Sequence, residues 1–403
     1  MAKAGDKGLS GVRTMTCYTM YICRTGRLEG LTMTNAAHCD ALLAGTKQPE
    51  RKIRVAYFLP LFPPYRGGAA TDGAVLAPAL GKLVELHVVT ERATDRPESE
   101  FLSQPGGARY HVLRVLPRYA SLETHGIRKL LGLVINRLAL LLILIRVRSA
   151  HRVDVVHLHG QYARFGMAYL LAALGRMLNV RMVLDIRDKG VGGAGLNLFE
   201  KVLAASASVA ANVKGHLSAD RLILTPIPHA MPTMLRAEGL PDHFFLFVGT
   251  VRKLKGVDVL LEAYRRYRGE GGTIPLILIG PIVDPELVNM PDIILLGPKP
   301  PSFVACAMQR CTLFLLPSRS EGLPHVCLEA IDLRTPFVVG PGIPEIEENC
   351  PSNVLAAVTP EHILSVLQKP ESVPRPDSYD LTPHAPQAIA KLLAEIYRTL
   401  SRQ

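Results

Sequence analysis

The sequence predicts an α/β protein of the GT-B architecture, with two doubly wound, Rossmann-like domains facing each other across a cleft. Its 403 residues are too many for one ordinary hydrophobic core and indicate domains of roughly 150–200 residues each. Short apolar segments alternate with longer segments of helical period, as in parallel sheets covered on both faces. A proline-rich stretch between Leu224 and Asp242 interrupts this alternation and marks a linker, because proline ends helices and cannot donate to a strand ladder.

Composition excludes several other classes of protein. A hydrophobic fraction of 48% excludes a mostly disordered chain, and 33 Gly with 31 Pro exclude a coiled coil. The longest apolar stretch, Leu130 to Ile145, is interrupted by Arg137, so we expect no membrane span. No secretory signal is recognised at the N-terminus. Seven irregularly spaced cysteines indicate reduced thiols and a cytoplasmic location.

Residues 1–50 differ from the rest of the chain. They show neither the strand period nor the helix period, so we predict a disordered extension, or residues upstream of the true start. Cys17, Cys23, His38 and Cys39 lie there, but their spacing matches no tetrahedral zinc pattern. We therefore predict no metal site in this protein.

The first domain is predicted over residues 51–232. It opens with a short apolar run bounded by a Pro/Gly loop, as expected of a buried parallel strand. The predicted strands and helices follow in order: strand Ile53–Leu59, helix Thr71–Leu83, strand Glu85–Thr90, helix Lys129–Arg148, strand Val153–His159, helix Tyr162–Leu178 and strand Arg181–Ile186.

The second domain is predicted over residues 233–385, where the same alternation starts again. Its predicted elements are strand Phe244–Val248, helix Gly256–Tyr267, strands Ile274–Ile279, Ile293–Leu296 and Leu313–Leu316, helix Val326–Leu333 and strand Pro336–Val339. Residues 386–403 form a last amphipathic helix, Pro386–Ser401, which we expect to cross back to the first domain. Ligands bind by default between the carboxyl ends of the strands of two such domains.

Gly67 and Gly68 stand between the first strand and the first helix. Bare backbone amides at a helix N-terminus attract phosphate, and glycine permits its close approach. The alternative is a simple tight turn. The G-x-G-x-x-G pattern of dinucleotide-binding folds is missing here, which disfavours a nicotinamide cofactor.

A basic loop, Gly249–Gly256, connects a strand to a helix at the start of the second domain. Arg252, Lys253 and Lys255 can reach phosphate oxygens there, in front of a helix N-terminus. The alternative interpretation is a solvated basic loop.

Glu321 and Glu329 flank the segment that follows the predicted strand Leu313–Leu316. The first lies at the end of the strand and the second on the next helix. Carboxylates accept paired hydrogen bonds from hydroxyls, which is how proteins grip a ribose or a hexose. Gly322 lies between the two acids and permits close approach to a bulky ligand.

Taken together, the Gly-Gly loop, the G-x5-K-G loop and the E-x7-E segment resemble retaining glycosyltransferases of the GT-B fold, most closely family 4, the group 1 glycosyltransferases. The resemblance extends from Ile53 to Leu400, and Glu321–Ala330 is its most specific part. It implies transfer of a sugar from a nucleotide-diphosphate sugar to a glycan or lipid-linked acceptor. It also implies retention of the anomeric configuration and no need for a bound metal or other cofactor.

The resemblance assigns roles to individual residues. Gly68 would lie near the donor phosphates, Lys255 would pair with the pyrophosphate, Glu321 would bind hydroxyls of the transferred sugar and Glu329 the ribose. Positive charge placed where the leaving diphosphate develops negative charge is the physical basis of such catalysis. The residues expected to act in catalysis are Glu321, Lys255 and Arg252, and those expected to bind the donor are Gly67, Gly68, Gly249, Lys255, Glu321, Gly322, Leu323 and Glu329.

The sequence departs from the family pattern at three places. Thr250 stands where the family has an arginine, and we hypothesise that Arg252 reaches the same phosphate. Arg187 and Asp188 follow a strand where the family commonly has a histidine. Near the domain junction, Pro228–Pro232 replaces the usual Asn-Gly turn. Thr250 and Arg187 motivate one alternative, a nucleotide-sugar binding protein that has lost turnover. A second alternative is another GT-B enzyme, such as a nucleotide-sugar epimerase.

Charge is distributed unevenly along the chain. Residues 51–236 contain 25 basic and 12 acidic residues, whereas residues 237–403 contain 15 and 19. A basic half indicates an anionic partner or serves solubility. The leucine-rich segment 128–152 either covers the sheet or lies on an anionic membrane at the inner face, with basic side chains near the head groups: Arg128, Lys129, Arg146, Arg148 and Arg152. We exclude a nucleic-acid partner, because no such motif occurs and aromatics do not interleave with the basic residues.

Overall fold

The computed structural model forms two compact units, Met1–Arg51 and Lys52–Gln403. In the first unit the backbones of two strands are described, β1 (Thr19–Arg24) and β2 (Arg27–Thr32), which pair antiparallel. The other residues of the predicted extension, 1–50, lie outside the described residues. So do the side chains of Cys17, Cys23, His38 and Cys39. In the second unit the structure describes residues 52–65, 67–103, 108–117, 127–163, 167–188, 190–191, 195–234, 237–288 and 293–402.

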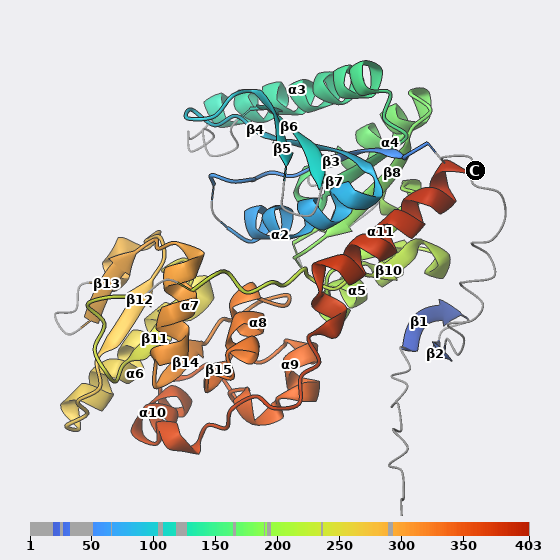
Figure 1. Cartoon of the computed structure of the whole chain (residues 1–403). Helices are drawn as coiled ribbons and strands as arrows, with labels where there is room; N and C mark the ends of the chain where they lie inside the picture. The colour runs from blue at the N-terminus through green and yellow to red at the C-terminus, as the bar shows by residue number, and fades with distance from the viewer. Residues whose placement is uncertain are drawn as a thin grey trace, which may run out of the picture. The chain divides into compact units, whose positions relative to one another are not determined.

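An 8-stranded sheet forms the N-terminal domain of the second unit, in the order β10-β9-β8-β7-β3-β4-β6-β5 (Figure 1). Neighbouring strands are parallel, except that β5 runs antiparallel to β6 at the edge. The strands are β3 (Arg54–Phe58), β4 (Glu85–Glu91), β5 (Ser99–Ser103), β6 (Arg109–Leu116), β7 (Val155–His159), β8 (Arg181–Ile186), β9 (Lys201–Ala204) and β10 (Leu222–Leu224).

Four of these strands, β5, β6, β9 and β10, were not predicted from the sequence. β6 contains His111 and Arg114 within its apolar run, and both side chains are buried in the fold. β5 alternates between exposed and half-buried residues, which is typical of an edge strand. β9 and β10 have only 4 and 3 residues, too few to show a period.

Helices cover both faces of this sheet, as expected for a doubly wound fold. They are α2 (Gly68–Leu83), α3 (Ile127–His151), α4 (Met167–Met177) and α5 (Ala207–Val213). The helix predicted from Tyr162 is in fact divided: a 3₁₀ turn over Gly160–Ala163 is followed by α4. The predicted strand Arg181–Ile186 agrees with β8 at both ends.

The last helix of the chain, α11 (Pro386–Ser401), packs onto the N-terminal domain. Its residues Ile389, Leu393 and Tyr397 are buried in one cluster with Leu76 and Leu80 of α2. The hydroxyl of Tyr397 lies 2.5 Å from Nδ1 of His157 in β7. The chain therefore returns to its first domain after completing the second (Figure 1).

The C-terminal domain is built on a 5-stranded parallel sheet, in the order β13-β12-β11-β14-β15. Its strands are β11 (Phe245–Val248), β12 (Leu276–Ile279), β13 (Ile293–Gly297), β14 (Leu313–Leu316) and β15 (Phe337–Val339). Its helices are α6 (Val257–Gly269), α7 (Pro301–Arg310), α8 (His325–Asp332), α9 (Pro344–Asn349) and α10 (Pro360–Gln368).

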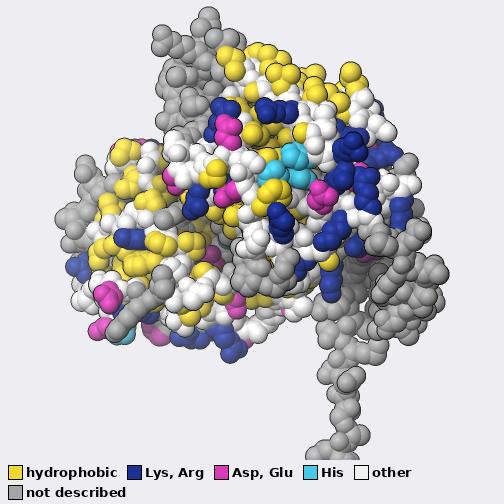
Figure 2. Space-filling model, turned by 45° about the horizontal axis from the view of Figure 1, so that its top comes forward, with side chains coloured by type: hydrophobic (Ala, Val, Ile, Leu, Met, Phe, Trp, Pro, Cys, Tyr) yellow, Lys and Arg dark blue, Asp and Glu magenta, His cyan; other side chains and the backbone are white. Residues whose placement is uncertain are grey.

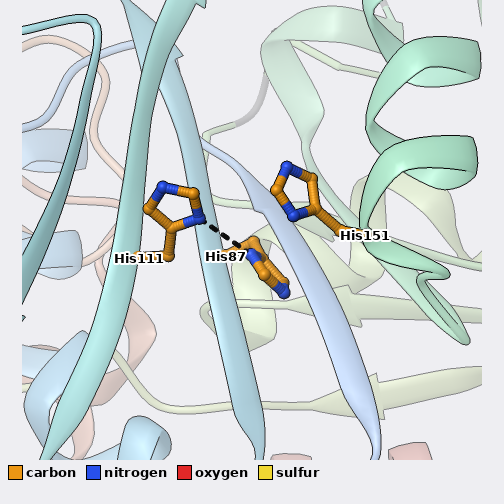
Figure 3. Close-up of side chains that lie close together, drawn as sticks. All are labelled: His87, His111 and His151. Atoms are coloured by element: carbon orange, nitrogen blue, oxygen red, sulfur yellow. Dashed lines mark hydrogen bonds between the residues drawn. The ribbon is translucent and has the colours of Figure 1, made fainter.

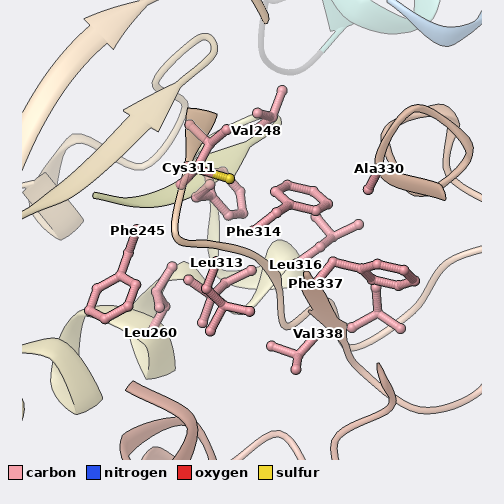
Figure 4. Packing of buried hydrophobic residues seen from close by; sticks show 14 of the residues in the cluster. Phe245, Val248, Leu260, Cys311, Leu313, Phe314, Leu316, Ala330, Phe337 and Val338 are labelled. Atoms are coloured by element: carbon pink, nitrogen blue, oxygen red, sulfur yellow. The ribbon is translucent and has the colours of Figure 1, made fainter. Parts of the chain in front are cut away.

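Every residue of β11, β12 and β14 is buried, because helices cover both faces of this sheet. Figure 4 shows Phe245, Leu313 and Phe314 of the two central strands packed with Phe337 of β15 and Leu260 of α6. Such a core holds the loops at the ends of the strands in fixed positions.

Strand order reverses at one place in each sheet, between β3 and β7 and between β11 and β14. At such a switch point the connections from neighbouring strands run in opposite directions, which leaves room for a ligand outside the carboxyl ends. The Gly67–Gly68 pair follows β3. The basic loop follows β11, and Glu321 follows β14. Both sheets therefore have predicted site residues at their switch points.

Candidate functional site

The loops after β11 and β14 bring Lys255 and Glu321 into contact. The Lys255 Nζ donates to Glu321 Oε1 at 2.5 Å, and 27% and 12% of the two side chains are exposed. These residues are 66 positions apart in the chain. They meet because β11 and β14 are hydrogen-bonded neighbours in the sheet. A lysine and an acid that the sequence predicts for one donor site thus lie together.

Gly256 makes this approach possible. Its φ is +70°, and a Cβ there would lie 1.9 Å from the carbonyl oxygen of Pro317, so only glycine fits. Arg319 fastens the second loop to the first: its guanidinium binds both carboxylate oxygens of Asp258 in α6 at 2.7 and 2.8 Å. The backbone amide of Arg319 donates to the carbonyl of Leu254 at 3.1 Å.

The other predicted cations of the basic loop lie elsewhere. Lys253 Nζ is 3.7 Å from Glu286 Oε1, and both side chains are largely exposed. The side chain of Arg252 is exposed. The structure therefore brings Lys255, and neither of these two, to Glu321.

Glu329 lies on α8, eight residues after Glu321. Burial raises the pKa of its carboxyl to about 7, although the nearby His325 opposes the shift. At neutral pH this group therefore exchanges between a carboxyl, which donates a hydrogen bond, and a carboxylate, which accepts two. Both forms suit a diol such as the one in ribose.

The Gly-Gly pair of the first domain faces the start of α8. Gly67, at φ +131°, precedes α2, which begins without a side-chain cap. A Cβ on Gly68 would lie 3.9 Å from Cδ2 of His325. In the next turn, Asp72 Oδ1 lies 2.9 Å from His325 Nε2. The free amides at the start of α2 thus lie beside the segment that carries both acids.

Arg187 lies between two carboxylates and is almost fully buried. Its Nε and Nη2 donate to Asp185 Oδ2 at 2.9 and 2.6 Å, and its Nε is 3.9 Å from Asp72 Oδ2. Burial alone would favour the neutral forms of these groups. Attraction outweighs it, so the pKa of Arg187 is raised and that of Asp185 is held well below its usual range. Arg187, which stands where the resemblance predicts a histidine, is therefore part of a buried ion-pair network.

His325 also remains charged more readily than usual. Burial opposes the imidazolium, but attraction to Asp72 outweighs burial and raises the pKa of His325. Its ring therefore joins the two domains through an ion pair with α2. A second link runs from the backbone amide of Ala207, at the start of α5, to Glu345 Oε1 of α9 at 2.6 Å.

Three other predicted donor-binding residues, Gly249, Gly322 and Leu323, have contacts within the protein. A Cβ on Gly322 would lie 3.1 Å from the carbonyl oxygen of Arg187, so this glycine admits close approach of the other domain's backbone. The side chain of Leu323 is buried in the hydrophobic core of the C-terminal domain. Gly249, at φ +152°, donates its amide to the carbonyl of Ile279 at 2.9 Å. Their roles toward a donor stay predictions.

Sequence reasoning missed Asp72 and gave His325 no role. Asp72 is a buried acid in the second turn of an apolar helix, a position where an unpaired charge would be costly. An acid at an apolar position of a helix therefore indicates that another element supplies a cation to pair with it. His157 and His159 are both buried, and His157 lies between Tyr397 and Asp185. Their burial and the contacts of His157 give them a role in packing the sheet.

The C-terminal domain matches a known protein family. Residues 242–367 match the family model described as "Glycosyl transferases group 1". This segment contains the basic loop, Glu321 and Glu329.

Solved structures match most of the chain at low sequence identity. A sucrose-phosphate synthase from Thermosynechococcus elongatus is 14% identical, with a TM-score of 0.64 over 87% of this chain and 99% of that one. A trehalose 6-phosphate synthase from Burkholderia multivorans is 11% identical, with a TM-score of 0.61 over 87% and 99%. A protein from Listeria monocytogenes described as a UDP-N-acetylglucosamine 2-epimerase is 14% identical, with a TM-score of 0.55 over 87% and 98%.

These neighbours and the two Rossmann-like sheets confirm the predicted GT-B fold. The family match and the GT-B neighbours also support the prediction that the protein is a glycosyltransferase.

Proposed function

We propose that this protein transfers a sugar from a nucleotide-diphosphate sugar to a glycan or lipid-linked acceptor with retention of the anomeric configuration, as family 4 enzymes do. The contact between Lys255 and Glu321 supports this most directly. It joins an ammonium group suited to a diphosphate with a carboxylate suited to sugar hydroxyls. Without a donor the two groups neutralise each other.

The same geometry suggests which residue would bind each part of the donor. The diphosphate would draw the Lys255 ammonium away from Glu321, which would then accept hydrogen bonds from the transferred sugar. Glu329, one helix turn and a loop further on, would hold the ribose. As the glycosidic bond breaks, positive charge already in place would stabilise the leaving diphosphate without a metal ion.

The N-terminal domain would supply the other side of the site. The unpaired amides at the start of α2 would face the donor phosphates, with His325 beside Gly68. The acceptor would enter from this domain, so that its hydroxyl attacks on the face from which the diphosphate leaves.

Binding of nucleotide sugars tests the donor assignment. The thermal unfolding of the full chain would be followed with UDP-, GDP- and ADP-sugars, since a ligand that binds the native state raises the unfolding temperature. Lys255→Met should weaken the binding of the best donor about 10- to 100-fold, the worth of a charged hydrogen bond. Lys253→Met is the matched control, two residues earlier on the same loop and paired with Glu286, and should leave affinity unchanged. Equal effects of both substitutions would refute the assignment.

Glu329→Ala tests the ribose assignment separately. Calorimetry should show weaker binding both of the nucleotide sugar and of the free nucleoside diphosphate, because the two share the ribose. Glu321→Gln should weaken only the binding of the nucleotide sugar. An unchanged affinity of the Glu329 variant would contradict this part of the proposal.

A nucleotide-sugar epimerase is the second candidate, and the likeness to the Listeria protein favours it. Incubation with a labelled donor separates the possibilities by product. A transferase gives a labelled acceptor and free nucleotide, an epimerase gives an altered sugar, and a binding protein without turnover returns the donor unchanged.

We also propose that α3 rests on an anionic membrane at the inner, cytoplasmic face. Among the helices that the structure describes, none has the length and apolar character to cross a bilayer. One face of α3 packs on the sheet through Leu140, Leu144 and Val147. Its outer side exposes an apolar stripe on which five side chains are between 37% and 66% exposed: Val134, Ile135, Leu138, Leu142 and Ile145.

Figure 2 shows hydrophobic side chains gathered along one edge of this face, with lysine and arginine side chains nearby. Arg146 and Arg152 are exposed, as a contact with anionic head groups requires. The side chains of Arg128 and Lys129, which we also expected there, lie outside the described residues. A lipid-linked acceptor would then meet the site at the membrane surface.

Vesicle sedimentation tests this part. The protein should bind vesicles that contain phosphatidylserine better than neutral ones, and high salt should weaken the binding. Leu138→Gln with Leu142→Gln should reduce binding at least about tenfold, because both side chains leave the apolar phase. Leu295→Gln, at an exposed leucine of β13, is the control and should bind normally. Equal binding of all three proteins would contradict the membrane role.

A further inference from the structure

Three histidines from three separate elements meet in the N-terminal domain (Figure 3). His87 lies on β4 and His111 on β6, directly opposite each other in the parallel ladder. His151 is the last residue of α3. Each offers a ring nitrogen, and these nitrogens all lie within 4.8 Å of one another.

The spacing of the rings fits a tetrahedral metal. Nδ1 of His87 lies 3.3 Å from Nδ1 of His111. Zinc–nitrogen bonds of about 2.0–2.1 Å at tetrahedral angles put neighbouring ligand nitrogens about 3.3–3.4 Å apart. The third ring, His151, lies with its centroid 4.4 Å from that of His87 and 5.3 Å from that of His111.

An oxygen lies near the opposite ring nitrogen of two of these histidines, within hydrogen-bond distance for His111 and slightly farther for His87. Nε2 of His111 is 2.7 Å from Ser99 Oγ, and Nε2 of His87 is 3.5 Å from Glu85 Oε1. When Nδ1 binds a metal, Nε2 carries the proton and is oriented by an oxygen in this way. Phe101 also stacks on His111, with centroids 4.3 Å apart, and holds that ring in place.

We propose that His87, His111 and His151 bind one divalent transition-metal ion, with Zn²⁺ as the best fit. Three nitrogens leave a fourth position for water. The site lies near the amino ends of β4 and β6, whereas the donor loops follow the carboxyl ends of β11 and β14, so the ion takes no part in sugar transfer. It ties the end of α3 to the sheet and so fixes the helix that carries the exposed apolar stripe.

The test is a metal titration of the full chain after treatment with a chelator. Co²⁺, which replaces Zn²⁺ and is visible, should bind one per chain and give the strong visible absorption of four-coordinate cobalt. Zn²⁺ should then displace it. His151→Ala should weaken the affinity more than about 100-fold, since losing even the outer partner of a ligand costs about 10- to 100-fold. Ser99→Ala should cost about tenfold.

His216→Ala removes an exposed histidine and serves as the control, with unchanged affinity. His151 is only partly buried, so its loss should leave the circular dichroism spectrum unchanged; if it does not, the Ser99 variant alone decides. Amide exchange in the last turns of α3 should slow when Zn²⁺ binds and should not respond in His151→Ala. A histidine pair joined only by a hydrogen bond would bind no cobalt, and adventitious metal would bind the His151 and control variants equally. Either result would overturn the proposal.

Discussion

The two domains each place a charged cluster at the carboxyl end of their sheet, and the clusters differ in burial. Lys255 and Glu321 of the C-terminal domain keep 27% and 12% of their side chains exposed. In the N-terminal domain, Arg187, Asp185 and Asp72 keep 8% or less. The first pair can change partners when a ligand arrives, because water and ligand can replace either group. The second has no such freedom and must stay paired.

This difference in burial assigns a ligand-binding role to the Lys255–Glu321 pair and a structural role to the Arg187 cluster. A half-buried ion pair contributes little to stability but offers two charges to a substrate. A buried ion pair is costly to break, because the remaining charge has no water to replace its partner. Four substitutions measure the contrast.

Arg187→Met should destabilise the protein by about 3–5 kcal/mol, because it leaves the buried carboxylate of Asp185 without its guanidinium partner. Denaturant unfolding measures this loss. Adding Asp185→Asn to the Arg187 variant should recover part of it, since the orphaned charge is then gone. If the single substitution costs less than about 1 kcal/mol, the two clusters do not differ in the way described.

Gly256→Ala should cost about 2–4 kcal/mol, from the left-handed backbone and the contact with the carbonyl of Pro317. It should also abolish donor binding, because the loop that carries Lys255 must move. Gly271→Ala is the control: φ there is +89°, but a Cβ meets nothing within 4 Å. That control should cost about 1–2 kcal/mol and leave donor binding intact. Chemical denaturation and calorimetry give both quantities.

Glu329 should make stability depend on pH. Its pKa is about 7 in the folded protein and has the ordinary value of 4.5 when unfolded, so the folded state favours the proton. The resulting stability is complete below about pH 4.5 and is lost as the pH rises through about 7. Relative to Glu329→Gln, the native protein should lose about 2 kcal/mol between about pH 5 and pH 8.

Unfolding curves at several pH values measure this difference. Glu348→Gln, at an exposed acid, is the matched control and should follow the native protein at every pH. A constant difference between the native protein and the Glu329 variant would show that the carboxyl titrates normally.

Lys255→Met should have the smallest effect on stability, under about 1 kcal/mol. It should nevertheless weaken donor binding. The ammonium is partly solvated, and Glu321 can turn to water when its partner is lost. The comparison with Arg187→Met is direct, because each substitution removes one cation from an ion pair. A stability loss similar to that of Arg187→Met would mean that both clusters are structural.

The sequence predicted the C-terminal domain better than the N-terminal one, for a physical reason. β11, β12 and β14 are buried on both faces, so each appears as an uninterrupted apolar run. β6 contains a histidine and an arginine that are buried with partners from other elements, and no local pattern reveals such partners. The same holds at the site. Lys255 and Glu321 lie in recognisable loop patterns and Glu329 on the helix that follows, whereas Asp72 is one acid in an apolar helix.

By itself the sequence determined most of the strands with uninterrupted apolar runs, that two domains follow one another, and which loops carry acids and cations. These depend on local period and on residue type. Only the tertiary structure decided that Lys255 contacts Glu321 while Lys253 turns to Glu286, that Asp72 pairs with His325, and that three histidines share one place. Such pairings depend on strand order and on distances between residues far apart in the chain. A local sequence pattern contains no direct information on either.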